Sequence, residues 1–160
     1  MIGIISDSHD NLTAVRRAVR FFNDMACRLV IHAGDFVAPF AAAEFRELRC
    51  PIKAVFGNCD GEKKALVAIL EGKGEIVTAP LAFEQSGRRF RVFHLDAHVR
   101  EAVRSGSCDV LIYGHTHKPE VRRDHGVLIV NPGEAGGRLH RRSTVAVLDP
   151  ETLDVEVLPL

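Results

Sequence analysis

The strongest constraint on the fold is a series of short apolar runs, each four or five residues long and each followed closely by polar residues. The runs are rich in Val, Ile and Phe, which favour strands, and they are too short for buried helices. They occupy Ile2–Ile5, Leu29–His32, Ile52–Phe56, Phe90–His94 and Val110–Tyr113. The sequence therefore predicts buried strands that end in polar loops.

Helical periodicity between the first three runs indicates parallel connections. Asn11 is suited to cap a helix, and apolar residues recur at helical spacing from Leu12 to Phe22. A second helix is expected over Pro39–Leu48, with a proline in its first turn. The order strand, helix, strand, helix, strand predicts a parallel sheet covered by helices.

The rest of the chain mixes hairpins with short helices. Gln85-Ser86-Gly87 and Asp124-His125-Gly126 each separate two short strand-like runs, which predicts two hairpins. The expected helices are Glu62–Leu70 and Ala97–Arg104, and the expected strands are Leu81–Glu84, Arg88–Phe93, Glu120–Arg123, Val127–Val130, Thr144–Leu148 and Val155–Leu158. Parallel and antiparallel pairing should therefore occur together.

Composition excludes several classes of protein. A chain of 160 residues is about the size of one domain, so a single domain over residues 1–160 is expected. Lys plus Arg equals Asp plus Glu at 21 each, which gives no bulk positive field for nucleic acid or an anionic membrane. No apolar run approaches the ~20 residues of a membrane span, and the N-terminus does not resemble a signal peptide. We therefore expect a cytoplasmic protein.

Residues of metal-ligand type follow five successive strands, where open α/β sheets bind their ligands. They are Asp7 and His9, Asp35, Asn58 with Cys59 and Asp60, His94, and His115 with His117. Most of these motifs alone are common turns or caps, whereas the alternating histidines of Gly114-His115-Thr116-His117 can reach one polar centre or lie idle in an exposed loop. The four cysteines form no CxxC pair that would indicate a thiolate zinc site. The joint occurrence of Asp, Asn and His at five strand ends is hard to obtain from turn statistics. The sequence therefore favours a metal centre.

In type and order these residues resemble the calcineurin-like metallophosphoesterases, specifically their small single-domain archaeal and bacterial phosphodiesterase branch. Asn131-Pro132-Gly133 is similar to the closing loop of that family, and the resemblance covers nearly the whole chain. It implies an α/β fold in which two mixed β-sheets form a sandwich flanked by helices. It also implies a binuclear metal site on the loops at one edge.

The resemblance implies a set of seven candidate ligands. Asp7, His9, Asp35 and His117 would hold one ion, and Asp35, Asn58, His94 and His115 would hold the other, with Asp35 bridging. Two carboxylates with two dications leave an excess of roughly two positive charges, which attracts a phosphate. Imidazole, carboxylate and amide ligands together suit Mn, Fe, Co, Ni or Zn better than Ca or Mg, and manganese is the first expectation.

The expected function is that of a metal-dependent phosphoesterase, taken first as a phosphodiesterase, in which a hydroxide activated at the binuclear site attacks a small phosphate ester. Asn58, Cys59 and Asp60 are the expected catalytic residues. A homo-oligomer is also considered. Two alternatives stay open: a phosphomonoesterase acting on proteins or nucleotides, and a protein-binding scaffold like the retromer subunit of this fold. The complete ligand set favours an enzyme.

Three positions depart from the family pattern. His94-Leu95-Asp96 stands where the family often has His-Gly-His, which leaves a ligand role open for His98, although His98 is expected on a helix. Cys59 replaces a histidine that would assist the leaving group, which favours diesters, and its alternative role is that of a buried small residue. Glu134 places an acid near the expected mouth of the site, where it would disfavour polyanionic substrates.

Several other polar residues are given structural roles. His32 is expected to be hydrogen-bonded inside the protein, and His125 to lie in a hairpin turn. Lys118, Arg122, Arg123 and the basic run from Arg138 to Arg142 are interpreted as a solvated face, with substrate steering as the alternative.

Overall fold

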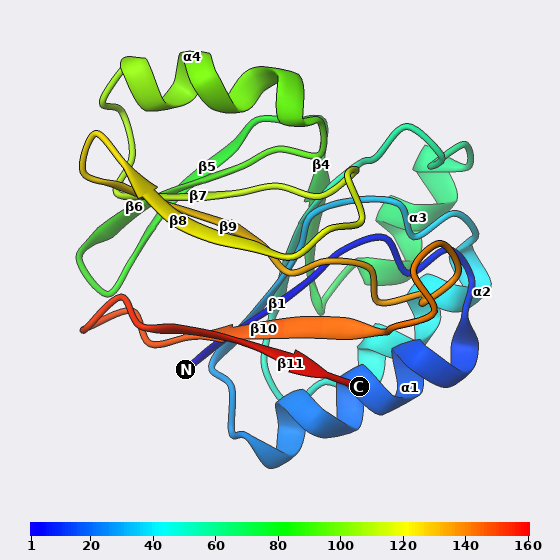
Figure 1. The fold of residues 1–160 in the computed structure, drawn as a ribbon. Helices are drawn as coiled ribbons and strands as arrows, with labels where there is room; N and C mark the ends of the chain where they lie inside the picture. Colours follow the sequence, from blue (N-terminus) through cyan, green and yellow to red (C-terminus); the bar gives the residue numbers. More distant parts are fainter.

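Two β-sheets pack against each other, and each is covered by helices on its outer face. A computed structural model describes residues 1–160 and shows these layers in the order α4, second sheet, first sheet and α1 (Figure 1). Both sheets mix parallel with antiparallel pairs, which confirms the predicted α/β fold class. Along the sequence, the first strands belong to the first sheet, the middle strands form the second sheet, and the last two strands return to the first sheet.

The first sheet has six strands in the order β11-β10-β1-β2-β3-β4. The strands are β1 (Ile2–Ile5), β2 (Leu29–His32), β3 (Ile52–Val55), β4 (Gly74–Val77), β10 (Thr144–Leu148) and β11 (Val155–Pro159). Strands β1 to β4 run parallel to one another, because each pair is joined through a helix, while β10 lies antiparallel to β1. The connecting helices are α1 (Leu12–Asp24), α2 (Pro39–Ala42) and α3 (Lys63–Leu70).

The second sheet has five strands in the order β5-β6-β7-β9-β8. They are β5 (Leu81–Gln85), β6 (Arg88–Val92), β7 (Val110–Ile112), β8 (Glu120–Asp124) and β9 (Val127–Asn131). The two predicted hairpins are confirmed as β5 with β6 and β8 with β9. One short helix, α4 (Val99–Arg104), covers the outer face of this sheet.

Apolar side chains fill each interface between layers. Ile4 and Ile31 of the first sheet pack against a cluster that includes Val92, Val110 and Val130 of the second. A separate cluster on the other face of the first sheet receives the buried stripe of α1. The core therefore lies within the layers and leaves the loops at the strand ends free for polar residues.

Some elements differ from the sequence prediction. The expected helix over Pro39–Leu48 is α2 followed by a 3₁₀ turn over Ala43–Glu47, and a similar turn over Asp96–His98 precedes α4. Strand β4 was not predicted, because only Ile76 among its four residues is buried. None of the helices is both long and apolar enough to span a membrane.

Candidate metal centre

The loops that follow the central strands gather at one edge of the two sheets, on the right in Figure 1. Asp7 and His9 follow β1, Asp35 follows β2 and Asn58 follows β3, so the first sheet supplies four of the seven candidate ligands. The second sheet supplies the other three, His94 after β6 and His115 and His117 after β7.

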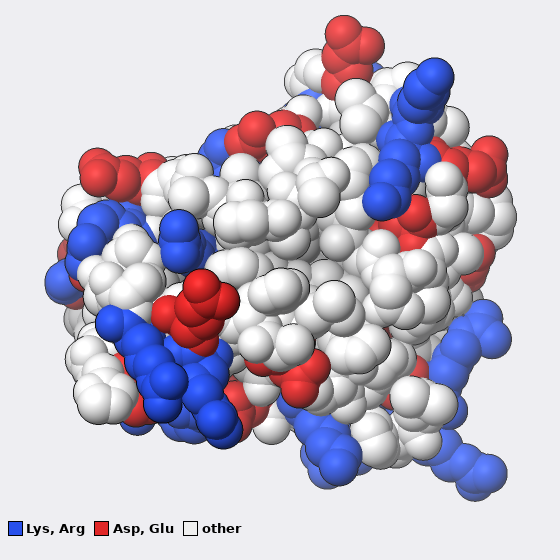
Figure 2. Space-filling view, turned by 90° about the horizontal axis from the view of Figure 1, so that it is seen from above, with Lys and Arg blue, Asp and Glu red and all other residues white.

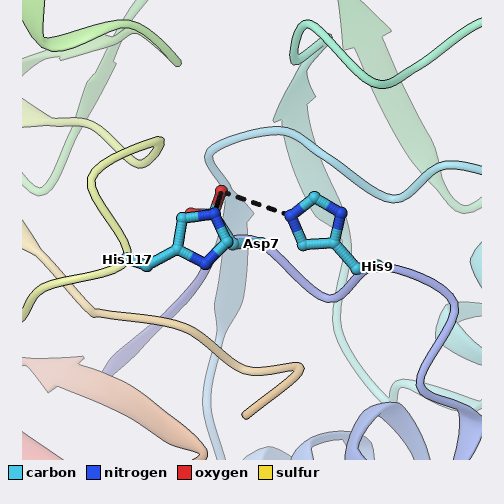
Figure 3. A group of neighbouring side chains, drawn as sticks. All are labelled: Asp7, His9 and His117. Carbon is cyan, nitrogen blue, oxygen red and sulfur yellow. Dashed lines mark ion pairs between the residues drawn. The ribbon is translucent and has the colours of Figure 1, made fainter. Parts of the chain in front are cut away.

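Asp7, His9 and His117 form the first group of neighbouring ligand atoms. Asp7 Oδ1 lies 3.4 Å from His117 Nε2 and 3.9 Å from His9 Nε2. Figure 3 shows both rings close to the carboxylate, and their centroids are 5.2 Å apart in a stacked arrangement. Ligand atoms that share a transition-metal ion at ~2.1 Å lie ~3–3.5 Å apart, so this spacing fits a shared ion.

Three side-chain atoms of the residues in this first group are buried without a hydrogen-bond partner. They are Asp7 Oδ1, His9 Nε2 and His117 Nδ1, and the Asp7 side chain is fully buried. Burial raises the pKa of Asp7 above its ordinary value because desolvation disfavours the carboxylate, although the neighbouring Ser6 hydroxyl and the nearby His117 and His94 oppose this shift. Buried polar atoms are normally paired, so this group fits a cation as its partner.

A second group surrounds His94. Its Nδ1 lies 2.8 Å from the carbonyl oxygen of Ala33, which can only accept, so Nδ1 carries the proton and donates it. The unprotonated Nε2 then faces Asn58 Oδ1 at 2.8 Å and Asp35 Oδ2 at 3.5 Å. Three electron-rich atoms that face one another in this way fit a cation between them.

Asp35 lies between the two groups. Its Oδ2 is 3.5 Å from His9 Nε2 and 3.5 Å from His94 Nε2. Its other oxygen, Oδ1, accepts the Cys59 amide at 2.8 Å, which fixes the orientation of the carboxylate. One carboxylate oxygen is therefore shared between a histidine of each group.

The remaining site residues are placed differently from one another. The His115 ring lies 5.2 Å from that of His94, but its nitrogens join none of the close ligand groups, and its backbone N–H donates to Asp7 Oδ2. His98 lies in the 3₁₀ turn before α4, where it stacks on Phe93. The structure thus brings His94, and not His98, to the candidate metal centre.

Cys59 is exposed, so its interpretation as a buried packing residue is wrong. Its thiol belongs to a close group with His9 and Asp35. Partial desolvation, a hydrogen bond with Asp35 and the neighbouring carboxylates together raise the pKa of Cys59 to about 11. In this environment the side chain is a neutral thiol at pH 7.

Asp60 is buried, and its carboxylate accepts three backbone amides. The donors are Gly57 at 2.7 Å, Val37 at 2.8 Å and Asp35 at 3.1 Å. These bonds tie the loop after β3 to the loop after β2. The expected catalytic residue Asp60 therefore contacts backbone, and it shapes the loop that carries Asn58.

His32 is a structural residue, as predicted. Its Nδ1 accepts the Gly34 amide, so Nε2 carries the proton and donates to Ser8 Oγ at 3.2 Å. Ser8 in turn donates to the carbonyl of Asp35. Complete burial keeps the pKa of His32 well below its ordinary value, and the neutral ring stacks on Phe36. This chain of hydrogen bonds links the loops that carry the two carboxylate ligands.

Glu134 is buried, and its carboxylate accepts hydrogen bonds from backbone amides. The sequence did not predict these contacts. The donors are the amides of Arg138, Leu139 and His140. Burial would raise the pKa of Glu134, but these amides and His117 lower it below its ordinary value. Glu134 lies on the wall of the cavity beside His9 and His117, so an acid is near the mouth as expected, but its carboxylate is engaged by backbone amides. The one signal in the sequence is Gly136-Gly137, which allows the chain to turn back over Glu134.

Glu134 also contacts a candidate ligand. Its Oε1 lies 3.5 Å from His117 Nδ1, the nitrogen on the side of the ring away from Asp7. Carboxylates in this position orient ligating histidines and raise their basicity. A cavity of about 440 Å³ opens beside this pair, and its walls include His9, Val37, Arg138 and Leu139. The arrangement can hold a cation and admit a small ligand next to it.

Comparisons with known proteins agree with this geometry. The calcineurin-like phosphoesterase superfamily domain matches residues 1–153. Phosphodiesterase MJ0936 of Methanocaldococcus jannaschii is 40% identical over 154 residues, which cover 94% of this chain and 93% of the relative. Phosphodiesterase YfcE of Escherichia coli is 27% identical, covering 96% of this chain and 89% of the relative.

Solved structures give the same result for the fold. The structure of a novel archaeal phosphodiesterase superposes with a TM-score of 0.95 at 37% identity and covers 99% of both chains. Vps29 of Entamoeba histolytica complexed with Zn²⁺ has a TM-score of 0.69 at 18% identity, covers 99% of this chain and 97% of that one, and is similar in fold alone. The chain therefore belongs to the calcineurin-like phosphoesterase superfamily, whose members hydrolyse phosphoric esters.

Proposed function

We propose that this hydrolase is a phosphodiesterase that works with two divalent transition-metal ions. The observation that carries the proposal is the position of Asp35 Oδ2, which is 3.5 Å from a histidine nitrogen of each ligand group. A carboxylate shared in this way is what a binuclear site requires. The names of MJ0936 and YfcE support the choice of a diester substrate.

The ligand assignment follows the two groups. Asp7, His9 and His117 would hold one ion with Asp35, and Asp35, Asn58 and His94 would hold the other, with His115 completing the set by a rotation of its ring. Manganese is the first candidate, because mixed nitrogen and oxygen ligands suit first-row transition metals. When bound, two such ions would acidify a water molecule and neutralise charge that develops on the phosphate.

Two residues of the chain face the substrate side of this centre. Asn58 and Cys59 are both exposed, and the Asn58 amide nitrogen lies 3.4 Å from Cys59 Sγ. With Oδ1 turned to His94 and one amide proton directed to Cys59 Sγ, the Asn58 amide nitrogen has a second proton that can be donated to a phosphate oxygen. A thiol is a poorer proton donor than an imidazolium, so Cys59 gives less help to a poor leaving group than a histidine would. Diesters with good leaving groups are therefore the preferred substrates.

The proposal is tested with metal-free protein reloaded with Mn²⁺. Hydrolysis of bis(p-nitrophenyl) phosphate should require the metal and exceed that of p-nitrophenyl phosphate. Asp35→Ala should bind fewer than two ions per chain, as measured by elemental analysis. Full activity after verified metal removal would overturn the proposal, and a preference for the monoester would favour the phosphomonoesterase alternative.

The assignment of His94 is tested with a matched pair of variants. His94→Ala should reduce bound metal, whereas His98→Ala should bind it like the wild type, because His98 stacks on Phe93 in the turn before α4. Elemental analysis and isothermal titration calorimetry with Mn²⁺ measure both. Metal loss in His98→Ala alone would reverse the assignment.

The role of Cys59 is tested through the leaving group. Cys59→His should raise the rate most for alkyl esters, which need a proton on departure, and least for nitrophenyl esters. The measurement is the slope of log kcat/KM against leaving-group pKa for metal-loaded wild type and variant. An unchanged slope would show that position 59 does not assist departure.

A further inference from the structure

A second cavity lies beside the candidate metal centre and is lined by cationic side chains. It has a volume of about 360 Å³ and shares His117 with the first cavity. Its walls include Lys118, His140 and Arg142, together with Thr144, and no Asp or Glu. Basic side chains, with no acidic one among them, therefore line a cavity next to His117, a residue of the candidate metal centre.

The cations in this cavity are not neutralised by the protein. Some exposed basic residues are paired within the chain, namely Arg16 with Glu44, Arg89 with Asp109 and Arg122 with its two acidic neighbours, whereas others, such as Arg20 and Lys64, are unpaired but line no cavity with Lys118 and Arg142. The side chains of Lys118 and Arg142 form no ion pair or hydrogen bond within the chain. Because like charges repel, their gathering around one hollow favours an anion inside it.

The backbone segment that carries His140 and Arg142 is held in place. Glu134 accepts the amides of Arg138, Leu139 and His140 through its buried carboxylate. At the other end of the segment, Thr144 donates its amide to the Glu134 carbonyl at 3.0 Å and its hydroxyl to the Pro132 carbonyl at 2.8 Å. The backbone of this part of the cavity wall is thus anchored at both ends, by amides bound to the buried Glu134 and by Thr144, so the cavity is formed before any ligand arrives.

We propose that this cavity is an anion subsite that receives a second negatively charged group of the phosphodiester substrate. The proposal rests on the proposed function, since the scissile phosphate would lie at the metal centre on the near side of His117. Lys118 and Arg142 would bind the oxygens of a further phosphate, for which ammonium and guanidinium groups are well suited. The substrate class is a small diester that carries an additional phosphate.

The charge distribution of the chain favours a small substrate over a polymer. The face shown in Figure 2, seen from above the view of Figure 1, is largely uncharged, and its Lys and Arg residues lie in separate groups that form no continuous positive track. The net charge of the chain is zero, so a long polyanion gains little outside the cavity. Recognition is therefore confined to one additional charged group.

The kinetic test compares two nitrophenyl diesters that differ by one phosphate. They are thymidine 5'-(p-nitrophenyl phosphate) and its 3'-phosphorylated form, assayed with Mn²⁺-loaded protein. Replacing both Lys118 and Arg142 by Ala should lower kcat/KM for the 3'-phosphorylated ester about 10-fold or more, mainly through KM, and leave the other ester within about twofold. The control variant, Arg20→Ala with Lys64→Ala, removes the same charges from α1 and α3 and should change neither.

An equal effect of the Lys118 and Arg142 replacement on both esters would overturn the subsite while leaving the phosphodiesterase intact. If the wild type hydrolyses neither ester, the proposed function fails. A binding experiment then tests separately whether the subsite exists. Inorganic phosphate titrated into metal-free protein should then shift the NMR amide signals of Lys118, His140 and Arg142 in a saturable way. The shifts should be absent in the double variant, and no response in the wild type would overturn the proposal.

Discussion

Five of the seven candidate ligands adopt a backbone conformation that side chains rarely occupy. Their φ angles are positive, between 42° and 66°, at Asp7, His9, Asp35, His115 and His117. Each such residue costs of order 1–3 kcal/mol and is held only where the surroundings fix it. Here the fixing contacts are hydrogen bonds between loops, such as Asp7 N–H to the Gly34 carbonyl and His9 N–H to the Asp35 carbonyl. The site is therefore shaped by its backbone before a ligand binds.

Because Gly57 has no side chain, Asp35 can lie close against the backbone of the loop after β3. A Cβ at Gly57 would lie 2.0 Å from Asp35 Oδ1 and 2.4 Å from the Asp35 amide nitrogen. Gly57→Ala should therefore displace the shared carboxylate and weaken Mn²⁺ binding about 10-fold or more, as measured by calorimetry. Gly61→Ala is the matched control, because a Cβ there meets nothing within 4 Å. Equal affinity in the two variants would contradict this role of Gly57.

Glu134 joins a candidate ligand to the wall of both cavities. In Glu134→Gln, the amide nitrogen of the new side chain would face backbone N–H donors that now bind a carboxylate oxygen. We expect Mn²⁺ affinity to fall about 10–100-fold and proteolysis between residues 138 and 142 to become faster. Glu156→Gln on β11 should change neither quantity. Unchanged metal affinity with faster proteolysis would limit Glu134 to a role in the loop.

At the scale of elements, the pattern of apolar residues in the sequence predicted the strands that are buried in the structure. The strands that lie at the centre of a sheet are continuous apolar runs, so the sequence places β1, β2 and β7 within a residue or so. Strand β4 lies at a sheet edge and has two exposed residues, so its four residues carry little periodic signal. The length of a regular helix within Pro39–Leu48 likewise depends on packing that the sequence pattern does not show.

The candidate site was predictable in its residue types and not in its supporting contacts. Asp, Asn and His at strand ends can be read from the order of residues alone, and the structure brings most of them together. The roles of Asp60 and Glu134 depend on which way a loop turns its backbone amides. Such turns are set by tertiary contacts between loops that are distant in sequence, which no local pattern encodes.

Strands β6 and β7 are joined at one end by Arg89 and Asp109. The Arg89 guanidinium and backbone N–H both donate to the Asp109 carboxylate, and these bonds lower its pKa to about 2. Since the folded pKa lies below the ordinary value, the stabilisation is fully present above about pH 4 and is lost as the pH falls toward 2.

Asp109→Asn should therefore cost about 0.5–1 kcal/mol at pH 7, after allowance for the solvent exposure of the pair. Urea unfolding of metal-free wild type and variant at a series of pH values measures the difference. The gap should narrow between pH 4 and pH 2. A gap that stays constant over that range would show that the charge of Asp109 contributes nothing.

At the scale of the whole molecule, the candidate ligands come from both sheets. Asp35 and Asn58 follow strands of the first sheet, while His94 and His117 follow strands of the second. An ion held by both sets would link the two layers in the folded state only. At a free Mn²⁺ concentration 100 times Kd this linkage adds ~2.7 kcal/mol, which raises Tm by roughly 5–10 °C for a chain of this size.

Thermal unfolding with Mn²⁺ and after its removal tests the linkage. The wild type and His98→Ala should show the same rise in Tm, and Asp35→Ala should show a much smaller one. An identical Tm in the presence and absence of the ion, with binding verified by calorimetry, would mean that it does not join the layers.

Because the chain returns to its first sheet, part of that sheet can form only after the later residues have been synthesised. Strand β1 emerges first, yet its second neighbour is β10, paired from Ile2 with Leu148 to Ile4 with Ala146. The loop after β1 also needs residues from later in the sequence, since the Ser6 and Asp7 carbonyls accept hydrogen bonds from the amides of Ala135 and Gly136. Until those residues are synthesised, one edge of β1 is unpaired, and the backbone of the loop that bears Asp7 and His9 is held only by its bonds to the loop after β2. A nascent chain therefore completes the candidate metal centre only after Gly136 has been synthesised.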